Sequence, residues 1–182
     1  MASQSKEENV LKLILENSPL KEWHFQEIIR EAKVTKLVAN KWLKKYTAEG
    51  LLYHIKEKNR FPFFTVGANN QVYYSLKRVY FLDQLHKSGF FPKLLSLKTA
   101  KTIVLFGSMI KGDWYKDSDI DIFVLGKISN FNKNLYELKL HRNIEFHTFQ
   151  NKEDILKIET GLINNIINGY IIKGQIQDLI GG

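Results

Sequence analysis

Residues 102–124 constrain the fold of this chain more than any other segment, because they combine two apolar runs with an intervening turn. Thr102–Phe106 forms a continuous apolar run that predicts a buried strand. This strand runs directly into Gly107 and Ser108, which we expect to open a short helix. A polar turn follows, and residues 118–124 predict a second strand. The segment therefore indicates a strand–helix–strand unit within an α+β fold.

The second predicted strand carries two aspartates. Side chains alternate along a strand, so Asp119 and Asp121 share one face, whereas Ile120 and Ile122 point to the opposite face, into a core. Two neighbouring carboxylates in a half-buried place repel each other, which a structural role does not require. A divalent cation removes that repulsion, and Mg²⁺ typically binds through one or two carboxylates and substrate phosphates. The strand–helix turn offers backbone N–H groups and a hydroxyl to those phosphates.

These residues together resemble a known motif. The strings Leu105-Phe106-Gly107-Ser108, Lys111-Gly112 and Ser118-Asp119-Ile120-Asp121-Ile122 are similar to the motif of the DNA polymerase beta-type nucleotidyltransferase superfamily. The resemblance is strongest to its small "minimal" members in archaea and bacteria. It covers roughly residues 100–174, where Ile166–Gly174 resembles the last helix and strand of these domains. It implies a small mixed β-sheet with flanking helices over residues 100–182.

The resemblance also implies roles for particular residues. The nucleotide-binding residues would be Gly107, Ser108, Lys111 and Ser118. The catalytic and metal-binding carboxylates would be Asp119, Asp121 and, on a later strand, Glu145. A solvent-facing strand position is the alternative for Glu145. His147 shares the face of Glu145 by alternation, and we interpret it as an ordinary half-exposed strand histidine rather than a residue that orients a ligand.

The activity implied is Mg²⁺- or Mn²⁺-dependent transfer of a nucleoside monophosphate from a nucleoside triphosphate, with ATP as the expected donor, to an acceptor that the sequence does not identify. A toxin-type protein partner is one acceptor that the resemblance suggests. Two alternatives stay open. The domain is a nucleotide sensor of a DNA-binding transcriptional regulator, with little or no turnover, or it is a scaffold that retains a relic of an active site.

Residues 1–70 predict a different module. Apolar spacing indicates helices over residues 6–16, 21–32 and 36–49, and Thr35 and Gly50 are suited to cap the third helix. Two short strands, residues 51–55 and 61–66, flank a polar loop. Three helices followed by a β-hairpin resemble a winged helix-turn-helix domain.

The third helix would be the recognition helix of such a domain. Its exposed polar residues are then Lys36, Asn40, Lys41, Lys44 and Lys45, which are suited to phosphates and base edges. The net charge of +8 falls entirely in residues 1–100, because basic and acidic residues balance in 101–182. DNA, RNA or a protein partner is therefore expected at residues 1–70, and a homodimer is the expected state.

The remaining features bound the class of protein. Residues 71–99 predict connecting helices, and the aromatic residues of 71–87 have the spacing of a core face. The absence of cysteine excludes disulfides, zinc–thiolate sites and cysteine nucleophiles. Neither a membrane-spanning run nor an apolar signal core at the N-terminus is evident, so we expect a cytoplasmic protein.

Overall fold

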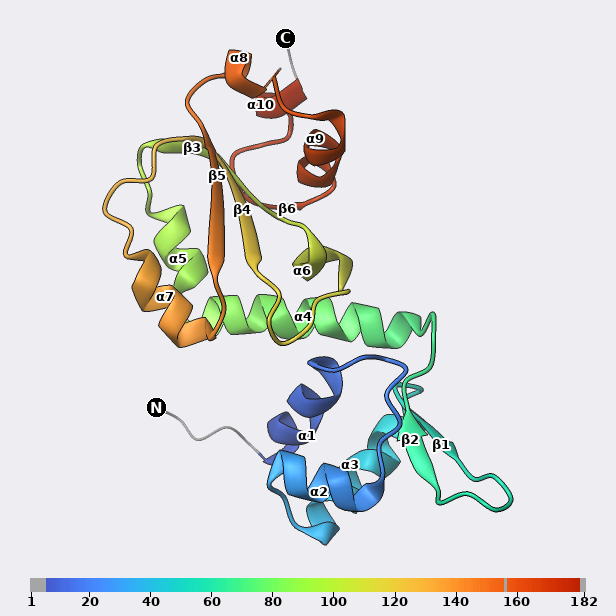
Figure 1. Cartoon of the computed structure of the whole chain (residues 1–182). Helices are drawn as coiled ribbons and strands as arrows, with labels where there is room; N and C mark the ends of the chain where they lie inside the picture. The colour runs from blue at the N-terminus through green and yellow to red at the C-terminus, as the bar shows by residue number, and fades with distance from the viewer. Residues whose placement is uncertain (1–5, 156, 181–182) are drawn as a thin grey trace. The chain divides into compact units, whose positions relative to one another are not determined.

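A computed structural model describes residues 6–155 and 157–180 (Figure 1). The first five residues, part of the N-terminal segment interpreted above as lacking a signal core, lie outside this description. The chain divides into two compact units, Met1–Lys77 and Arg78–Gly182. The boundary falls inside α4 (Gln71–Lys87), within the segment predicted to form connecting helices. Each unit is described by itself.

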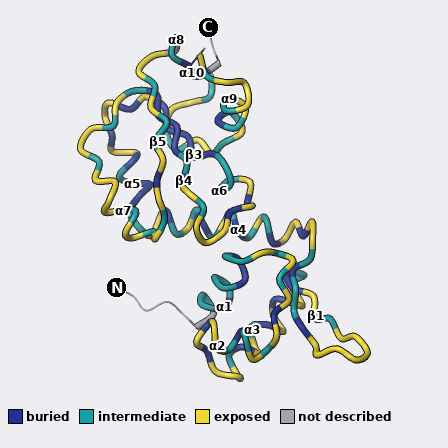
Figure 2. The backbone as a smooth tube through the Cα atoms, viewed as in Figure 1, coloured by how far each residue is buried: buried dark blue, intermediate teal, exposed yellow. Residues whose placement is uncertain are grey.

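Before α4, the described residues of the N-terminal unit form three helices and a two-stranded antiparallel hairpin, in the order predicted for residues 1–70. The elements are α1 (Lys6–Leu15), α2 (Phe25–Ala32), α3 (Lys36–Ala48), β1 (Tyr53–Ile55) and β2 (Phe63–Thr65). The Thr35 hydroxyl accepts a hydrogen bond from the Val38 N–H at 3.4 Å and so caps α3. Gly50 follows the helix with a φ of +74°, a conformation that favours glycine. The loop between β1 and β2 is exposed (Figure 2).

One helix boundary in this unit was predicted wrongly. The predicted helix over 21–32 begins only at Phe25, because Trp23 is extended and pairs with the hairpin. The Trp23 N–H donates to the Phe64 carbonyl at 2.8 Å, and the Phe64 N–H donates back at 2.9 Å. The Trp23 side chain is buried, so this long-range pairing outweighs the local helical spacing.

The C-terminal unit is built around a four-stranded mixed sheet. Its helices are α5 (Phe90–Leu95), α6 (Ser108–Lys111), α7 (Lys133–Leu140), α8 (Lys152–Ile155), α9 (Thr160–Ile167) and α10 (Gln177–Ile180). Its strands are β3 (Ala100–Phe106), β4 (Ile120–Gly126), β5 (Ile144–Phe149) and β6 (Tyr170–Lys173), in the spatial order β5-β4-β3-β6. β3 is antiparallel to both β4 and β6, whereas β4 and β5 are parallel. The predicted small mixed sheet with flanking helices is therefore confirmed.

Helices cover both faces of this sheet. On one face, Phe123 and Leu125 of β4 pack in a cluster with Ile155, Ile166 and Leu179, which belong to α8, α9 and α10. Burying these side chains supplies most of the stability of such a layer.

An aromatic cluster covers the opposite face of the sheet. The rings of Phe90, Phe131, Tyr136 and Phe146 lie 5.1–5.8 Å apart in successive pairs, which joins α5 and α7 to β5. Central β3 and β4 are accordingly the most deeply buried strands (Figure 2). The sheet is thus a rigid platform for the side chains at its ends.

No helix within residues 6–155 and 157–180 combines the length and apolar character needed to cross a bilayer.

Candidate active site

The backbone of Gly107 lies directly against the carboxylate of Asp121. Phe106, the last residue of β3, pairs with Asp121 of β4, so the turn after β3 begins beside that side chain. Gly107 has φ 78° and ψ −154°, a region open essentially to glycine alone. A Cβ at Gly107 would overlap the Oδ2 atom of Asp121. Glycine is therefore required here both by conformation and by the space that the carboxylate occupies.

Asp119 lies at the entrance to β4, one residue before the strand begins, and it is exposed. The predicted strand over 118–124 starts later, at Ile120, because Ser118 closes the preceding turn. The Ser118 hydroxyl accepts a hydrogen bond from the Tyr115 N–H at 2.8 Å. Ser118, predicted to bind nucleotide, thus shapes the loop that delivers Asp119.

Arg142 holds the same loop from the end of α7. Its guanidinium donates to the carbonyls of Tyr115, at 2.6 Å, and Ser118, at 3.0 Å. The guanidinium also lies 4.9 Å from the ring centre of the buried Trp114. Arg142 therefore anchors the loop before Asp119 through two backbone carbonyls and through the ring of Trp114.

Asp121 is one member of a cluster that extends onto β5. The parallel register pairs Asp121 with Glu145 and Phe123 with His147, which puts all three polar side chains on one sheet face. The His147 Nε2 atom lies 3.8 Å from Asp121 Oδ1 and 3.8 Å from Glu145 Oε1. One potential ligand atom from each of the three residues lies within 4.8 Å of the others. The resemblance implied that Glu145 joins the aspartates, whereas the proximity of His147 to Asp121 was not predicted.

Burial raises the pKa of Asp121 above its usual value. The negative charges of Glu145 and Asp119 raise it further, and His147 acts in the opposite direction. Asp121 is thus a partly desolvated carboxylate near other carboxylates, whereas Asp119, the other member of the predicted half-buried pair, is exposed and lies outside the cluster.

The cluster has the chemistry of a divalent-cation site. The His147 Nε2 atom is buried and makes no hydrogen bond within the described part of the chain. Two carboxylates and one imidazole nitrogen are donors that divalent metals accept. The residues present therefore fit a metal ion.

The remaining predicted nucleotide-binding residues lie at the adjoining turn. Ser108 begins α6 and is half-buried, and Lys111 ends the helix. The Lys111 ammonium donates to Asn165 Oδ1 of α9 at 3.0 Å. Gly107, Ser108 and Lys111 therefore belong to one short turn beside Asp121.

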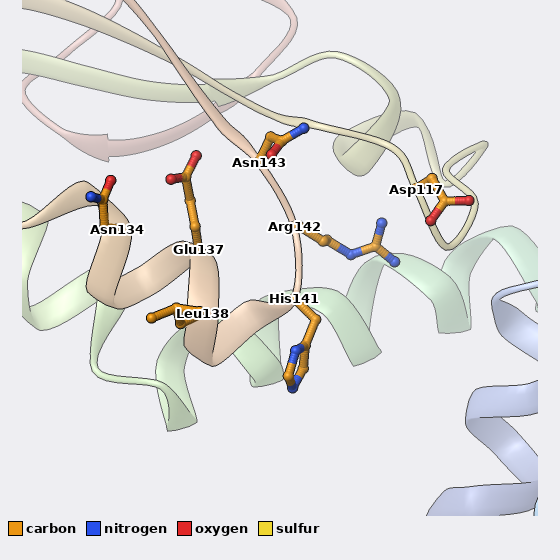
Figure 3. A pocket seen from close by; sticks show the side chains of 7 residues that line it. All are labelled: Asp117, Asn134, Glu137, Leu138, His141, Arg142 and Asn143. Atoms are coloured by element: carbon orange, nitrogen blue, oxygen red, sulfur yellow. The ribbon is translucent and has the colours of Figure 1, made fainter.

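A separate open pocket of about 720 Å³ lies beside α7. Its lining residues are Asp117, Asn134, Glu137, Leu138, His141, Arg142 and Asn143, and Figure 3 shows Arg142 extending toward the loop that carries Asp117. Glu137 and Arg142 already bind backbone groups of β5 and of that loop, respectively. No member of the acidic cluster lines the pocket, so we do not assign the chemistry to it.

In the N-terminal unit, the five polar residues predicted on the third helix are all exposed on α3: Lys36, Asn40, Lys41, Lys44 and Lys45. Lys41 and Lys45 lie within 4.9 Å of the ring centre of Trp42. Lys45 also forms an ion pair with Glu49 at 3.9 Å.

The four-stranded mixed sheet with its flanking helices is consistent with a nucleotidyltransferase fold. Comparison with protein families agrees, since residues 93–177 match the family model described as "Polymerase beta, Nucleotidyltransferase". This match supports a nucleotidyltransferase domain at these residues and, with it, a nucleotide substrate. No curated protein and no solved structure matches the chain.

Proposed function

We propose that this protein is a divalent-metal-dependent nucleotidyltransferase that moves a nucleoside monophosphate from a nucleoside triphosphate to the hydroxyl of an acceptor. ATP is the expected donor. The observation that carries the proposal is the close approach of Gly107 to Asp121 within a domain that matches the nucleotidyltransferase family model. This approach brings the turn that we propose to bind phosphate next to the carboxylate that we propose to bind the metal.

The three carboxylates and the turn at Gly107 then have separate roles. Asp119 and Asp121 hold the divalent cation, Mg²⁺ or Mn²⁺, which when bound neutralises charge on the triphosphate. The turn at Gly107 and Ser108 binds phosphate oxygens, and the missing side chain at Gly107 lets them approach the backbone. Glu145, whose side chain is 62 % exposed, completes the carboxylate set at the edge that an acceptor reaches from solvent.

The transfer step follows from these roles. The acceptor oxygen attacks the α-phosphorus in line as its proton passes to Glu145, and the bond from that phosphorus to the bridging oxygen of pyrophosphate breaks. Pyrophosphate leaves, and the nucleoside monophosphate remains on the acceptor oxygen. The raised pKa of Asp121 means that its ionised form is disfavoured in the free protein. A bound cation would therefore relieve the electrostatic cost of ionising this carboxylate.

The test is pyrophosphate release from each of the four nucleoside triphosphates, with Mg²⁺ or Mn²⁺, in the presence and absence of RNA, DNA and cell lysate. Asp119→Ala and Asp121→Ala should abolish release while the protein stays folded. Asp117→Ala is the matched control, because Asp117 is an exposed aspartate of the same loop to which we assign no part in binding the cation. Release that persists in both Asp119→Ala and Asp121→Ala would contradict the proposal.

A second candidate function rests on the basic face of α3. Its exposed lysines support a winged-helix module that binds nucleic acid or a protein partner, with the C-terminal unit sensing nucleotide. The same assay separates the two candidates. Metal-dependent nucleotide binding without release, together with salt-dependent DNA binding that changes with nucleotide, would favour the regulator.

A further inference from the structure

Beside its two carboxylates, the candidate metal site contains a nitrogen donor, the Nε2 atom of His147. His147 lies on β5, two residues after Glu145, and its ring packs 5.2 Å from the ring of Phe106. The histidine side chain is 24 % exposed, yet its Nε2 atom is buried and forms no hydrogen bond to any described residue. A buried ring nitrogen without a partner costs free energy unless it binds something that the polypeptide does not supply.

The surroundings of that nitrogen suit a cation. Nε2 is 3.8 Å from one oxygen of Asp121 and 3.8 Å from one oxygen of Glu145. Ligand bonds of about 2.1 Å place two donors of one metal ion no more than about 4.2 Å apart. Both separations fall within that span, and the three donor atoms all lie within 4.8 Å of one another. The exposed side chain of Glu145 is free to rotate toward the other two donors.

The packing of His147 fixes the direction in which this nitrogen points. Its ring is held by Phe106 at the end of β3, directly before Gly107. β4 and β5 then fix Asp121 and Glu145 by direct pairing. His147 and Asp121 are therefore positioned by strands of the sheet rather than by a loop, and Glu145 completes the site by rotating its exposed side chain.

We propose that His147 is a nitrogen ligand of the divalent metal, beside Asp121 and Glu145, and that it makes the site select Mn²⁺ over Mg²⁺. This inference rests on the proposed function only for the role of the metal in transfer. Mg²⁺ is a hard ion that prefers oxygen ligands and keeps its waters, whereas imidazole is a ligand for transition metals. A site with one imidazole and two carboxylates therefore discriminates between the two ions, and a site with carboxylates alone does so far less.

The experiment measures metal binding directly on the full chain without an affinity tag or nucleotide. The concentration of free Mn²⁺ is measured by electron paramagnetic resonance during titration, and the affinity for Mg²⁺ is measured by its competition with Mn²⁺. His147→Phe removes the nitrogen and keeps a ring against Phe106. His86→Phe, at an exposed position of α4 outside the cluster, is the matched control.

We expect the wild-type protein to bind Mn²⁺ at least about tenfold more tightly than Mg²⁺, because only Mn²⁺ gains from the imidazole. His147→Phe should weaken Mn²⁺ binding by about tenfold or more and Mg²⁺ binding by less than about threefold. His86→Phe should change neither. His147→Gln, which replaces the nitrogen donor with an amide, should lose the same preference and serves if the phenylalanine variant does not fold.

Equal affinity of the wild-type protein for the two ions, or an unchanged preference in both His147 variants, would overturn the inference. Pyrophosphate release measured on the same samples keeps this result apart from the proposed function. Release without a metal preference that depends on His147 refutes the ligand and leaves the transferase. A preference that depends on His147 without release supports the ligand and counts against transfer.

Discussion

Replacing Gly107 with alanine tests whether the approach of the turn to Asp121 holds the site together. The substitution has two separate costs. A non-glycine residue at φ 78° and ψ −154° costs of the order of 1–3 kcal/mol in backbone strain. The added Cβ would also overlap Asp121 Oδ2, so the carboxylate must turn away from the position in which it meets Glu145 and His147. We therefore expect lower stability together with loss of pyrophosphate release.

Two other glycines of the same unit separate these costs. Gly89 has φ 80° and no atom within 4 Å of the position that an added methyl group would occupy, so Gly89→Ala adds backbone strain without a clash. Gly161 lies in α9 with open space around it, and Gly161→Ala should be neutral or stabilising, by up to about 1 kcal/mol. The free energy of unfolding should therefore fall most for Gly107→Ala, less for Gly89→Ala and not at all for Gly161→Ala.

Thermal unfolding followed by circular dichroism measures these differences. For a protein of this size, a loss of 1–3 kcal/mol corresponds to a melting temperature lower by roughly 2–12 °C. Combining Gly107→Ala with Asp121→Ala removes the clash but keeps the strain, so the double variant should lose less stability than the two single changes predict together. A Gly107→Ala protein with wild-type stability and full pyrophosphate release would refute the reasoning.

Three further predictions concern residues outside the cluster. The Lys101 ammonium, with the Thr102 hydroxyl, holds the pKa of Asp178 at about 2, so Asp178→Asn should lower the free energy of unfolding at pH 7. Urea titrations should show this loss shrinking between about pH 4 and pH 2, where the native carboxylate takes up its proton. A loss that does not depend on pH would contradict the ion pair. Arg142→Ala should free the loop before Asp119, reducing release by about 100-fold and speeding chymotryptic cleavage at Tyr115, and an unchanged cleavage rate would contradict its anchoring role. Lys44→Ala should weaken duplex DNA binding and reduce the slope of log affinity against log salt by about 0.9, whereas an unchanged slope would exclude a phosphate contact by this side chain.

The sequence predicts the elements of this protein well wherever local pattern and tertiary packing agree. β3 and β4 were predictable because their apolar runs are buried on both faces, and α3 because Thr35 and Gly50 mark its ends. α7 was not predicted, since its apolar residues, Leu135, Tyr136, Leu138 and Leu140, fit both helical spacing and the two-residue alternation of a strand. The start of α2 was predicted too early, because Trp23 pairs with Phe64, a residue far along the chain, and no local pattern indicates that pairing.

The candidate site shows the same limit. Alternation along one strand was enough to place Asp121 on the face opposite Ile120 and Ile122, and to place Glu145 and His147 together. The distance between the two strands depends on the parallel register of β4 with β5, which no local pattern in either strand specifies. For this reason His147 was interpreted as an ordinary strand histidine, although its position two residues after Glu145 was the available signal.

The pairing of β3 with β6 has a consequence for synthesis of the chain. β3 is an internal strand, but one of its edges stays open until Tyr170–Lys173 has left the ribosome. Residues of the N-terminal unit can fold well before that point, because their contacts lie within the first 77 residues. Meanwhile Ile103, Val104 and Leu105 present an apolar, unpaired edge to other nascent chains. Translational pausing ahead of residue 170 should therefore favour aggregation of newly made protein, whereas pausing within the first unit should not.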